Sequence, residues 1–350
     1  MPVKVATSRC LKVGGRYIRR MKRVRFAPSP TGSLHVGNAL SAVINRREGD
    51  RLLLRIDDTD PTRNLESGEE AILRDLEWLG IAWDEGPVRQ SERQELYRAA
   101  VARLGDDRFG RTTLLREDGT ATYHLASVVD DAELGITHVY RGNDHRPNED
   151  LHRRLHEALG TTPPKYVHHG LILGEDGKKL SKRAEGATVA SLRELGIPAE
   201  AVRGYLEELG LPRHDVHYDL PRIRRLSVDA IEAMGDEELA ARAEIPSAAV
   251  PVARGARDLS EARNYAAQVL EAPEPRATAA PETLERFREL ADAEPRAVVR
   301  ELKAVGGDLR ALRVALTGRD RGPELAAILA ALPREEALRR VDQALQHTHS

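Results

Sequence analysis

The chain has 350 residues, 41% of them hydrophobic and 31% charged, which is typical of a soluble globular protein long enough for two domains. No apolar run approaches the roughly 18 residues that a membrane-spanning helix needs, so we expect no membrane partner. A net charge of −2 gives no overall attraction to nucleic acid, so any RNA contact must use local basic faces. The single cysteine, Cys10, excludes an internal disulfide and a cysteine-based zinc site, and we expect a reducing, cytoplasmic location.

The chain begins with a basic segment. Residues 1–20 contain no acidic side chain and no apolar core of signal-peptide length. We expect a disordered extension here, with a transit peptide or an RNA-binding arm as the alternatives.

The first half then alternates short apolar runs with helical patterns, which is typical of an α/β nucleotide-binding fold. Helices are predicted where apolar residues recur at helical spacing: from Val36 onwards, from a capping box at Ser67 and Glu70, over 96–104 and over 151–159. Strands are predicted for the remaining apolar runs: 24–27, a hairpin of 113–115 and 122–129 around Asp118-Gly119, 136–140 and 166–173.

The second half lacks strand signals from about residue 190 and predicts an all-α region. The expected helices span residues 199–209, 229–242, 282–291, 295–304, 309–317 and 323–344. The Pro- and Ala-rich stretch 272–281 predicts a linker between helical groups. We therefore divide the chain into four parts: an extension (1–20), an α/β domain (21–190), a helical junction (191–271) and a C-terminal helical region (272–350).

A loop that enters a helix is the first candidate site. Residues 25–38 read RFAPSPTGSLHVGN, in which Pro28 and Pro30 end the strand and His35 and Gly37 stand at the helix start. Free backbone amides and the positive end of the helix dipole favour phosphate at such a place. Gly37 leaves room for a phosphate or a flat ring to approach the backbone. The alternative is an ordinary strand–turn–helix unit with a capping histidine.

A lysine-rich loop is the second candidate site. Only eight of the 54 basic residues are lysines, and three of them lie within residues 177–183, GKKLSKR. An ammonium group on a flexible stem can follow a phosphate whose charge and position change during a reaction. Lys179 and Lys182 therefore indicate nucleotide chemistry, with a solvated surface turn as the alternative.

Together the two segments resemble the HIGH and KMSKS signatures of class I aminoacyl-tRNA synthetases, in the form used by the glutamyl-tRNA synthetase family. The resemblance covers residues 22–230 and again 309–345. It includes six further segments in the family's order: LRIDDTD (54–60), WDEGP (83–87), QSER (90–93), TYHLA (122–126), VVDD (128–131) and RGNDH (141–145). It implies a Rossmann-like class I catalytic domain with a parallel sheet, followed by an all-α C-terminal region that resembles anticodon-binding helices.

The resemblance implies glutamate–tRNA ligase activity. ATP would activate L-glutamate as glutamyl-adenylate, and the glutamyl group would move to the 3′ end of a tRNA, expected to be glutamate tRNA. The implied cofactor requirement is ATP with Mg²⁺ and no zinc, although no carboxylate cluster specifies a protein-held magnesium site. In the family, glutamate activation generally needs tRNA to be present. We expect a monomer.

The resemblance also implies the site residues. The expected catalytic residues are His35, Lys179 and Lys182. ATP contacts are expected from the same three residues and from Gly37, Asn38 and Ser181. Glutamate contacts are expected from Arg25, Ser29, Asp57, Tyr123, Ser127 and Arg141.

Each of these residues has chemistry suited to its role. His35 would donate to the ATP phosphates, and the two lysines would neutralise charge on the departing pyrophosphate. Arg25 and Arg141 would pair the carboxylates of glutamate as two-pronged donors. Asp57 would hold the α-amino group, and Tyr123 would form a wall of the pocket.

The chain departs from the family pattern at three places. Asp57 stands where bacterial members usually carry Glu, and Ser127 stands where many carry Asn. The third departure is larger, because the family inserts a domain between the positions of Leu104 and Thr112 that grips the tRNA acceptor end and can hold zinc. Here only residues 105–111 join these positions.

Four histidines are candidate metal ligands: His124, His138, His168 and His169. We expect core or turn histidines instead, because they alternate with apolar residues in predicted strands and lack a tight ligand spacing.

Three functions are therefore compared: a compact glutamate–tRNA ligase, a glutamate-activating ligase with another acceptor (a modified tRNA base, a carrier protein or a small amine), and a non-catalytic binding module. The chain retains His35, Lys179 and Lys182, which disfavours the non-catalytic binding module. A continuous arginine face would favour tRNA over a small acceptor. The residues expected on that face are Arg222, Arg224, Arg225, Arg310 and Arg313.

Overall fold

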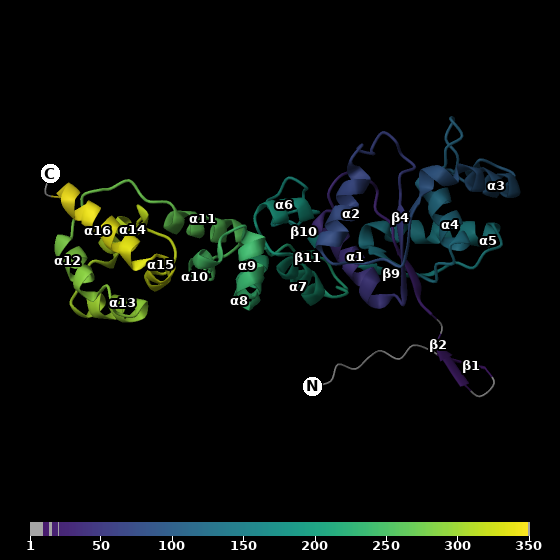
Figure 1. Cartoon of the computed structure of the whole chain (residues 1–350). Coiled ribbons are helices and arrows are strands. Elements are labelled where there is room, and N and C mark those ends of the chain that lie inside the picture. The colour runs from purple at the N-terminus through teal and green to yellow at the C-terminus, as the bar shows by residue number, and fades with distance from the viewer. Residues whose placement is uncertain (1–9, 14–15, 20, 349–350) are drawn as a thin grey trace. The chain divides into compact units, whose positions relative to one another are not determined.

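The computed structural model describes residues 10–13, 16–19 and 21–348. The chain divides into two compact units, and Figure 1 gives the element labels. The α/β unit contains the described residues up to Ser191 together with Arg203–Tyr218, and the helical unit contains Leu192–Val202 and the described residues from Asp219 onwards. No described helix is both long and apolar enough to cross a membrane.

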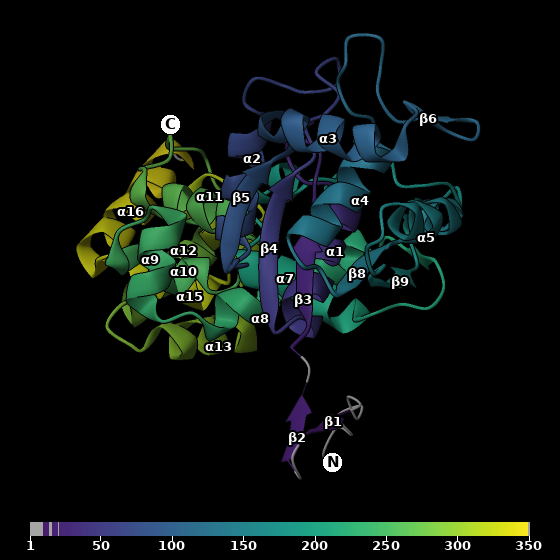
Figure 2. The ribbon, with the colours of Figure 1, turned by 90° about the vertical axis from the view of Figure 1, so that its right-hand side faces the viewer.

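Parallel strands form the centre of the α/β unit. Five strands carry the pattern: β3 (Arg23–Phe26), β4 (Arg51–Ile56), β5 (Glu85–Arg89), β8 (His138–Gly142) and β9 (Lys165–His169). β3, β4 and β5 lie side by side in that order, and β8 pairs with β9 (Figure 2). Thr137, just before β8, hydrogen-bonds with Arg23 at the start of β3. The carboxyl ends of β3, β4 and β8 therefore lie at one edge, where α/β folds place their ligands.

Helices and short strands lie between these five strands or follow the last of them in the chain. The helices are α1 (Val36–Glu48), α2 (Gly68–Trp78), η1 (Gln90–Arg93), α3 (Gln94–Leu104), α4 (Tyr123–Glu133), η2 (Asn143–Asn148), α5 (Glu149–Ala158), α6 (Val189–Glu194) and α7 (Ala199–Leu209). The short strands are β6 (Arg108–Phe109) with β7 (Thr112–Thr113), and β10 (Ile172–Leu173) with β11 (Val216–His217). Residues 10–13 and 16–19 pair as antiparallel β1 (Cys10–Val13) and β2 (Arg16–Arg19), and the rest of the expected extension lies outside the described residues.

Several predicted elements are confirmed, and the predicted hairpin is half wrong. α1, α3 and α5 form where apolar spacing predicted helices. The Asp118-Gly119 turn is present, with Leu115 bridged to Ala121, but residues 123–133 form helix α4 instead of a second strand. Val128 and Val129 favour strands locally, yet burial of the whole run Leu125–Asp131 in a helical packing overrides that preference. α2 begins after Ser67, but Ser67 makes no side-chain capping hydrogen bond, so the expected capping box is absent.

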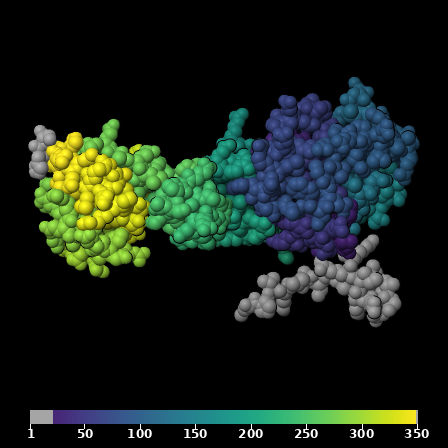
Figure 3. Space-filling view, viewed as in Figure 1, coloured from purple at the N-terminus to yellow at the C-terminus, as the bar shows by residue number. Residues whose placement is uncertain are grey.

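The helical unit consists of α8 (Leu220–Ala233), α9 (Asp236–Ala243), η3 (Ser247–Ala249), α10 (Val250–Ala253), α11 (Leu259–Leu270), α12 (Pro281–Leu290), α13 (Pro295–Ala304), α14 (Leu309–Thr317), α15 (Leu325–Ala331) and α16 (Arg334–Thr348). Their apolar faces share one core, and the last helices (yellow) pack against α12 and α13 (green) in the space-filling view (Figure 3). The coil between α11 and α12 matches the expected linker.

Two predicted helices of this unit are each divided in two. The helix expected over 229–242 breaks at Met234-Gly235, where Gly235 takes the extended N-cap conformation of α9. The helix expected over 323–344 breaks at Leu332, because Pro333 cannot continue a hydrogen-bonded helix. α10 and α11 were not predicted, and β11 contradicts the expectation of no strand after residue 190.

A fully buried guanidinium organises the interior of the α/β unit. Arg55 is 0% exposed within β4, between Leu54 and Ile56. Its Nε and one terminal nitrogen donate to the two carboxylate oxygens of Asp57 at 2.6 and 3.2 Å, and its other terminal nitrogen donates to Asp131 at 3.0 Å. Asp130 lies 3.7 Å from the same Nε. One cation thus compensates carboxylates from β4 and α4.

The two α4 carboxylates reach further elements. Asp130 accepts from Arg93 at 2.7 Å, from Gln90 at 2.9 Å and from the Tyr97 hydroxyl at 3.0 Å. Asp131 accepts from Nε of Arg25 on β3 at 3.1 Å. The cluster of Arg55 with these three aspartates therefore connects β3, β4, η1, α3 and α4.

Removing the buried guanidinium should destabilise the α/β unit strongly. Arg55→Met keeps the volume but leaves Asp57, Asp130 and Asp131 without their shared cation, and we expect a loss of about 3–5 kcal/mol in the free energy of unfolding. The measurement is urea denaturation followed by tryptophan fluorescence, because both tryptophans, Trp78 and Trp83, lie in this unit.

The matched control is Arg154→Met, which removes an exposed ion pair with Asp150 one helical turn away. We expect it to change the free energy of unfolding by less than about 0.5 kcal/mol. Equal losses in the free energy of unfolding for the two substitutions would show that the buried cluster stabilises the unit no more than an exposed ion pair does.

Candidate active site

The first motif forms a loop closed by a histidine cap. His35 is the N-cap of α1, and its ring Nδ1 accepts the backbone N–H of Gly37 at 3.1 Å. Val36 donates its N–H to the carbonyl of Ala187 at 2.9 Å. The free backbone amides expected at this helix start are therefore already used, which corrects the sequence prediction of how a phosphate would be met.

The His35 ring supplies a donor instead. Because Nδ1 accepts a hydrogen bond, a neutral ring carries its proton on Nε2. Nε2 is buried and has no hydrogen-bond partner among the described residues. Burial is the main cause that lowers the pKa of His35. The backbone of Leu180 raises this pKa, and the positive charges of Lys179 and Lys182 lower it further. A neutral imidazole with an unused N–H thus faces the lysine loop.

Gly37 leaves the space beside the His35 ring open. A β-carbon added there would meet only the His35 ring, at 3.4 Å from Nδ1. Asn38 is exposed on the first turn of α1, and Ser29 is half-buried in the loop before it. Gly37 and Asn38 lie where the sequence placed the ATP contacts, whereas Ser29 is one of the predicted glutamate contacts.

The lysine loop is exposed, and the ammonium groups of Lys182 and Lys179 contact different neighbours. Lys182 Nζ donates to the carbonyl and the hydroxyl oxygens of Thr31, both at 3.1 Å. Lys179 Nζ contacts Asp144 Oδ2 at 2.7 Å, and Asp144 follows β8 in the RGNDH segment. Ser181 is exposed, and its hydroxyl accepts the backbone N–H of Arg183 at 3.2 Å. Burial and Arg63 lower the pKa of Lys182.

Hydrogen bonds join the first motif to residues 188–190, which closely follow the lysine loop in the chain. His35 forms an antiparallel bridge with Thr188, and Val189 donates its N–H to the carbonyl of Leu34 at 2.9 Å. Ser33 Oγ accepts the N–H of Ala190 at 3.0 Å. The structure therefore brings the predicted catalytic set into one neighbourhood.

The predicted glutamate residues lie at the carboxyl ends of the parallel strands. Arg25 on β3 is 6% exposed and paired with Asp131, and Asp57 directly follows β4. Asp57 is positioned by Arg55 and by its own N–H, which donates to the carbonyl of Pro28 at 2.9 Å. Burial raises the pKa of Asp57, while Arg55 and Arg25 act in the opposite direction.

One face of α4 carries two more of these residues. Tyr123, Ser127 and Asp131 recur every four residues and therefore share a face. The Tyr123 hydroxyl lies 3.1 Å from His145 Nδ1, and the Ser127 hydroxyl is buried without a partner among the described residues. Burial raises the pKa of Tyr123, against the nearby cations of Arg141 and Arg25.

Arg141 on β8 is the most distinctive of the predicted glutamate residues. It is 6% exposed, and its Nε donates to His168 Nε2 at 3.2 Å. Both terminal nitrogens are buried and have no partner among the described residues. Burial lowers the pKa of Arg141. A buried cation with two unused donors is a place for an anion.

Sequence analysis missed residues that hold the site in place. Arg55, Asp130 and Asp131 lie in segments that the resemblance covered, but they received no role. The signal was available for Arg55, because a charged residue inside the apolar run of β4 must find buried partners. Asp144 and His145 likewise contact predicted site residues, and no local pattern indicates those contacts.

The four histidines lie in α4 and in the paired strands β8 and β9. His124 lies in α4 and not in a strand, with its Nδ1 3.1 Å from His152 Nε2, whereas His138, His168 and His169 lie in strands as expected. Burial lowers the pKa of His145 to about 4 and that of His152 to about 3, so both are neutral near pH 7. Within residues 21–348, no group of three or more His, Cys, Asp and Glu side chains is arranged to hold a metal ion.

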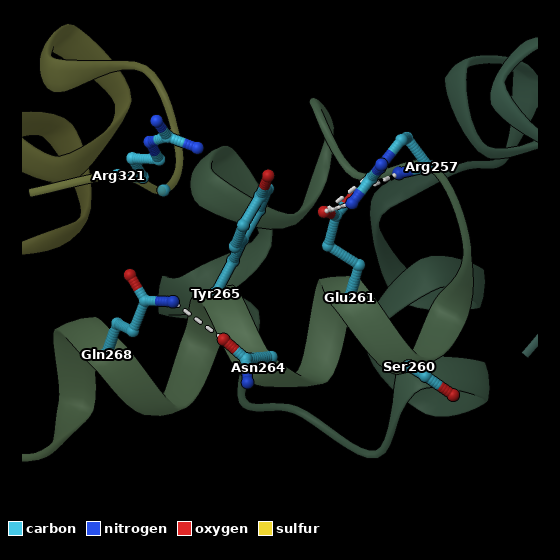
Figure 4. A pocket seen from close by; sticks show the side chains of 8 residues that line it. Arg257, Ser260, Glu261, Asn264, Tyr265, Gln268 and Arg321 are labelled. Atoms are coloured by element: carbon cyan, nitrogen blue, oxygen red, sulfur yellow. Dashed lines mark hydrogen bonds and ion pairs between the residues drawn. The ribbon is translucent and has the colours of Figure 1, made fainter. Parts of the chain in front are cut away.

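The helical unit has a separate groove along α11. Glu261, Tyr265 and Gln268 of α11, with Arg257 just before this helix and Arg321, line a pocket of about 500 Å³ (Figure 4). A second cavity of about 820 Å³ adjoins it through shared residues. Its lining is of mixed charge: Arg276, Arg310 and Arg319 alternate with Glu271, Glu274 and Asp320.

The arginine face expected from the sequence is interrupted. Arg310 pairs with Asp320 at 2.6 Å, and half-buried Arg313 donates to the carbonyl of Pro323. Arg225 lies 3.9 Å from Asp219. The groove along α11 is therefore lined by both positive and negative side chains. This mixed charge weakens the argument that a basic face binds RNA here.

Comparison with known families accounts for both units. The model of the class I tRNA synthetase (E and Q) catalytic domain matches residues 21–108 and 103–223, and that of an anticodon-binding domain matches 295–345. The catalytic match breaks in two where the sequence lacks the expected insert, between Leu104 and Thr112.

Two curated relatives match over nearly their whole length. The glutamate–tRNA ligase 1 of Rubrobacter xylanophilus is 36% identical over 92% of this chain and 97% of its own length. The glutamate–tRNA ligase of Akkermansia muciniphila is 33% identical over 91% of this chain and 98% of its own. The first alignment spans 428 positions against 350 residues here, so that relative contains segments with no counterpart in this chain.

A solved structure agrees with the fold. The crystal structure of a glutamate tRNA ligase from Elizabethkingia meningosepticum superposes with a TM-score of 0.75 at 23% identity, over 93% of this chain and 99% of that one. At this identity the likeness establishes the fold: a class I catalytic domain with parallel strands followed by a helical region. The sequence matches show that the chain belongs to the glutamate–tRNA ligase family of class I aminoacyl-tRNA synthetases.

Proposed function

We propose that this chain is a compact glutamate–tRNA ligase that activates L-glutamate with ATP and transfers it to tRNA. The observation that carries the proposal is the presence of two sets of donors in one unit, of which His35 Nε2 and the two terminal nitrogens of Arg141 have no partner among the described residues. His35 Nε2 and the lysine loop offer donors for phosphates, and Arg141 offers two for a carboxylate. These are the groups needed to hold ATP and a dicarboxylic amino acid together.

The first step joins the two substrates. A carboxylate oxygen of glutamate attacks the α-phosphorus of ATP, and the bond to the bridging oxygen breaks to release pyrophosphate. Charge accumulates on that leaving group, where Lys179 and Lys182 can neutralise it once they leave Asp144 and Thr31. In the second step a ribose hydroxyl at the tRNA 3′ end attacks the acyl carbon, and AMP leaves.

Pocket residues orient the amino acid. Arg141 and Arg25 meet carboxylates, Asp57 meets the ammonium group, and Tyr123 and Ser127 line one side from α4. Burial raises the pKa of Asp57, and Arg55 and Arg25 oppose that shift and so favour the charged carboxylate that accepts from the α-amino group. ATP would arrive with Mg²⁺, which screens phosphate charge and keeps most of its ligands as water and phosphate oxygens.

A second candidate function follows from specific observations. The catalytic match breaks at residues 103–108, where the family places its acceptor-gripping insert, and the α11 groove has mixed charge. A glutamate-activating ligase with another acceptor would need neither feature. The match of residues 295–345 to an anticodon-binding domain supports tRNA as the acceptor.

Removal of both loop lysines should block activation while leaving the fold intact. The double variant Lys179→Ala/Lys182→Ala loses the charges that face the leaving pyrophosphate, and adenylate formation should slow by about 10²–10³-fold or more. The measurement is single-turnover release of pyrophosphate, with circular dichroism to confirm folding. Lys178→Ala, in the same exposed turn, is the control and should stay within about threefold of the parent. Unchanged turnover in the double variant would remove the lysine loop from the mechanism.

Arg141→Ala should weaken glutamate use far more than ATP use. Loss of a buried charged partner costs about 2–5 kcal/mol, which predicts a rise in glutamate KM of about 30-fold or more. ATP KM should change by less than about threefold, since the phosphate donors are untouched. Arg146→Ala, an exposed arginine on η2, is the control. A selective rise in ATP KM would contradict the pocket.

The proposed function is tested by glutamate-dependent ATP–pyrophosphate exchange with and without total tRNA. Exchange that appears only with tRNA supports the compact ligase, because it requires the chain to engage tRNA. Exchange that is equal without tRNA supports the second candidate, in which activation is independent of tRNA. A folded chain with no exchange under either condition overturns both.

A further inference from the structure

Arg141 and His168 are direct neighbours in the parallel pair β8–β9, where their Cα atoms are partners in register. The Arg141 Nε donates to His168 Nε2 at 3.2 Å, and the His168 side chain is only 4% exposed. The imidazole therefore acts as a hydrogen-bond acceptor for one of the three nitrogens of the guanidinium.

The acceptor role of His168 requires one tautomer. For Nε2 to accept, the ring proton must lie on Nδ1, which is 3.5 Å from Glu149 Oε2 at the start of α5. The other carboxylate oxygen of Glu149 is held by Arg153, whose Nε and terminal nitrogen donate at 2.8 and 2.7 Å. Burial lowers the pKa of His168 and favours the neutral ring. Glu149 is thus positioned to select the Nδ1–H tautomer.

An aromatic ring closes this set of contacts. The guanidinium carbon of Arg141 lies 4.8 Å from the centroid of the Tyr166 ring, and that of Arg153 lies 5.2 Å from it. Arg141 is therefore restrained at its Nε edge by His168 and over its face by Tyr166. Its two terminal nitrogens remain buried and unused among the described residues.

The choice of nitrogen determines how a carboxylate can bind. A guanidinium can offer either Nε with one terminal nitrogen, or both terminal nitrogens, as its two-pronged donor. Because His168 occupies Nε, only the end-on pair is available. A terminal carboxylate that arrives along the axis of the arginine side chain fits this geometry, and the γ-carboxylate of glutamate is such a group.

We propose that His168 is a positioning residue for substrate recognition: it holds Arg141 by Nε, with its tautomer set by Glu149, so that the guanidinium meets the side-chain carboxylate of glutamate end-on. This inference rests on the proposed function for the identity of the ligand. The arrangement of the four side chains, Arg141, His168, Glu149 and Arg153, is independent of the proposed function.

The test compares variants of the full chain that differ in one acceptor. His168→Gln can still place an oxygen acceptor near Arg141 Nε, whereas His168→Leu cannot. We expect His168→Leu to raise the glutamate KM about tenfold or more, with ATP KM and kcat within about threefold of the parent. His168→Gln should recover most of the loss. Equal KM values for parent and His168→Leu, or equal defects in both variants, would overturn the proposal.

A matched control separates this effect from loss of any buried imidazole. His156 on α5 is 0% exposed and hydrogen-bonded to Thr161, and it contacts none of the predicted site residues in the described part of the chain. His156→Leu should lower stability without a selective change in glutamate KM. A rise in glutamate KM equal to that of His168→Leu would show that general loosening, and not the Arg141 contact, is responsible.

A spectroscopic measurement tests the positioning without any turnover. In the ¹⁵N-labelled parent near pH 7.5, the His168 ring should show a protonated Nδ1 and an unprotonated Nε2, and Glu149→Gln should weaken that preference. A protonated Nε2 in the parent would overturn the proposal. If the parent shows the expected tautomer but no exchange activity and no glutamate binding by calorimetry, the proposed function fails while the positioning contact stands.

Discussion

The buried ion cluster around Arg55 is the interaction on which the rest of the α/β unit depends. A guanidinium at 0% exposure is tolerable only because carboxylates from β4 and α4 surround it, and those carboxylates in turn fix Arg25 and the η1–α3 corner. The same contacts place Asp57 and Arg25 at the strand ends. Stability and substrate recognition therefore share one set of charges, so a change to the cluster affects both.

The site combines fixed and releasable contacts. His35 and Arg141 are buried, and each keeps unused donors because a neighbour, Gly37 or His168, fixes the ring or the guanidinium. Lys179 and Lys182 are exposed and make contacts that a phosphate can replace. Rigid recognition of the amino acid with a movable pair of cations suits a reaction in which charge shifts towards a leaving group.

Sequence reasoning succeeded where the information is local. α1 was predicted from apolar spacing, and α7, α13 and α14 match the predicted spans residue for residue. It failed where tertiary packing overrides local preference. Residues 123–129 carry strand-forming valines, yet they lie in α4, because burial of Leu125–Asp131 in helical packing overrides the local preference.

By itself, the sequence determined the chemistry available to this protein: two phosphate-type loops, the arginines and carboxylates of an amino-acid pocket, and a helical second half. These follow from residue type and short-range spacing, which the chain carries directly. Only the tertiary structure decided which atoms are free. The contacts of Arg55 with α4 and the His168 contact that leaves two Arg141 nitrogens unused both join segments distant in the chain. Such contacts depend on strand register and helix packing, which no local pattern encodes.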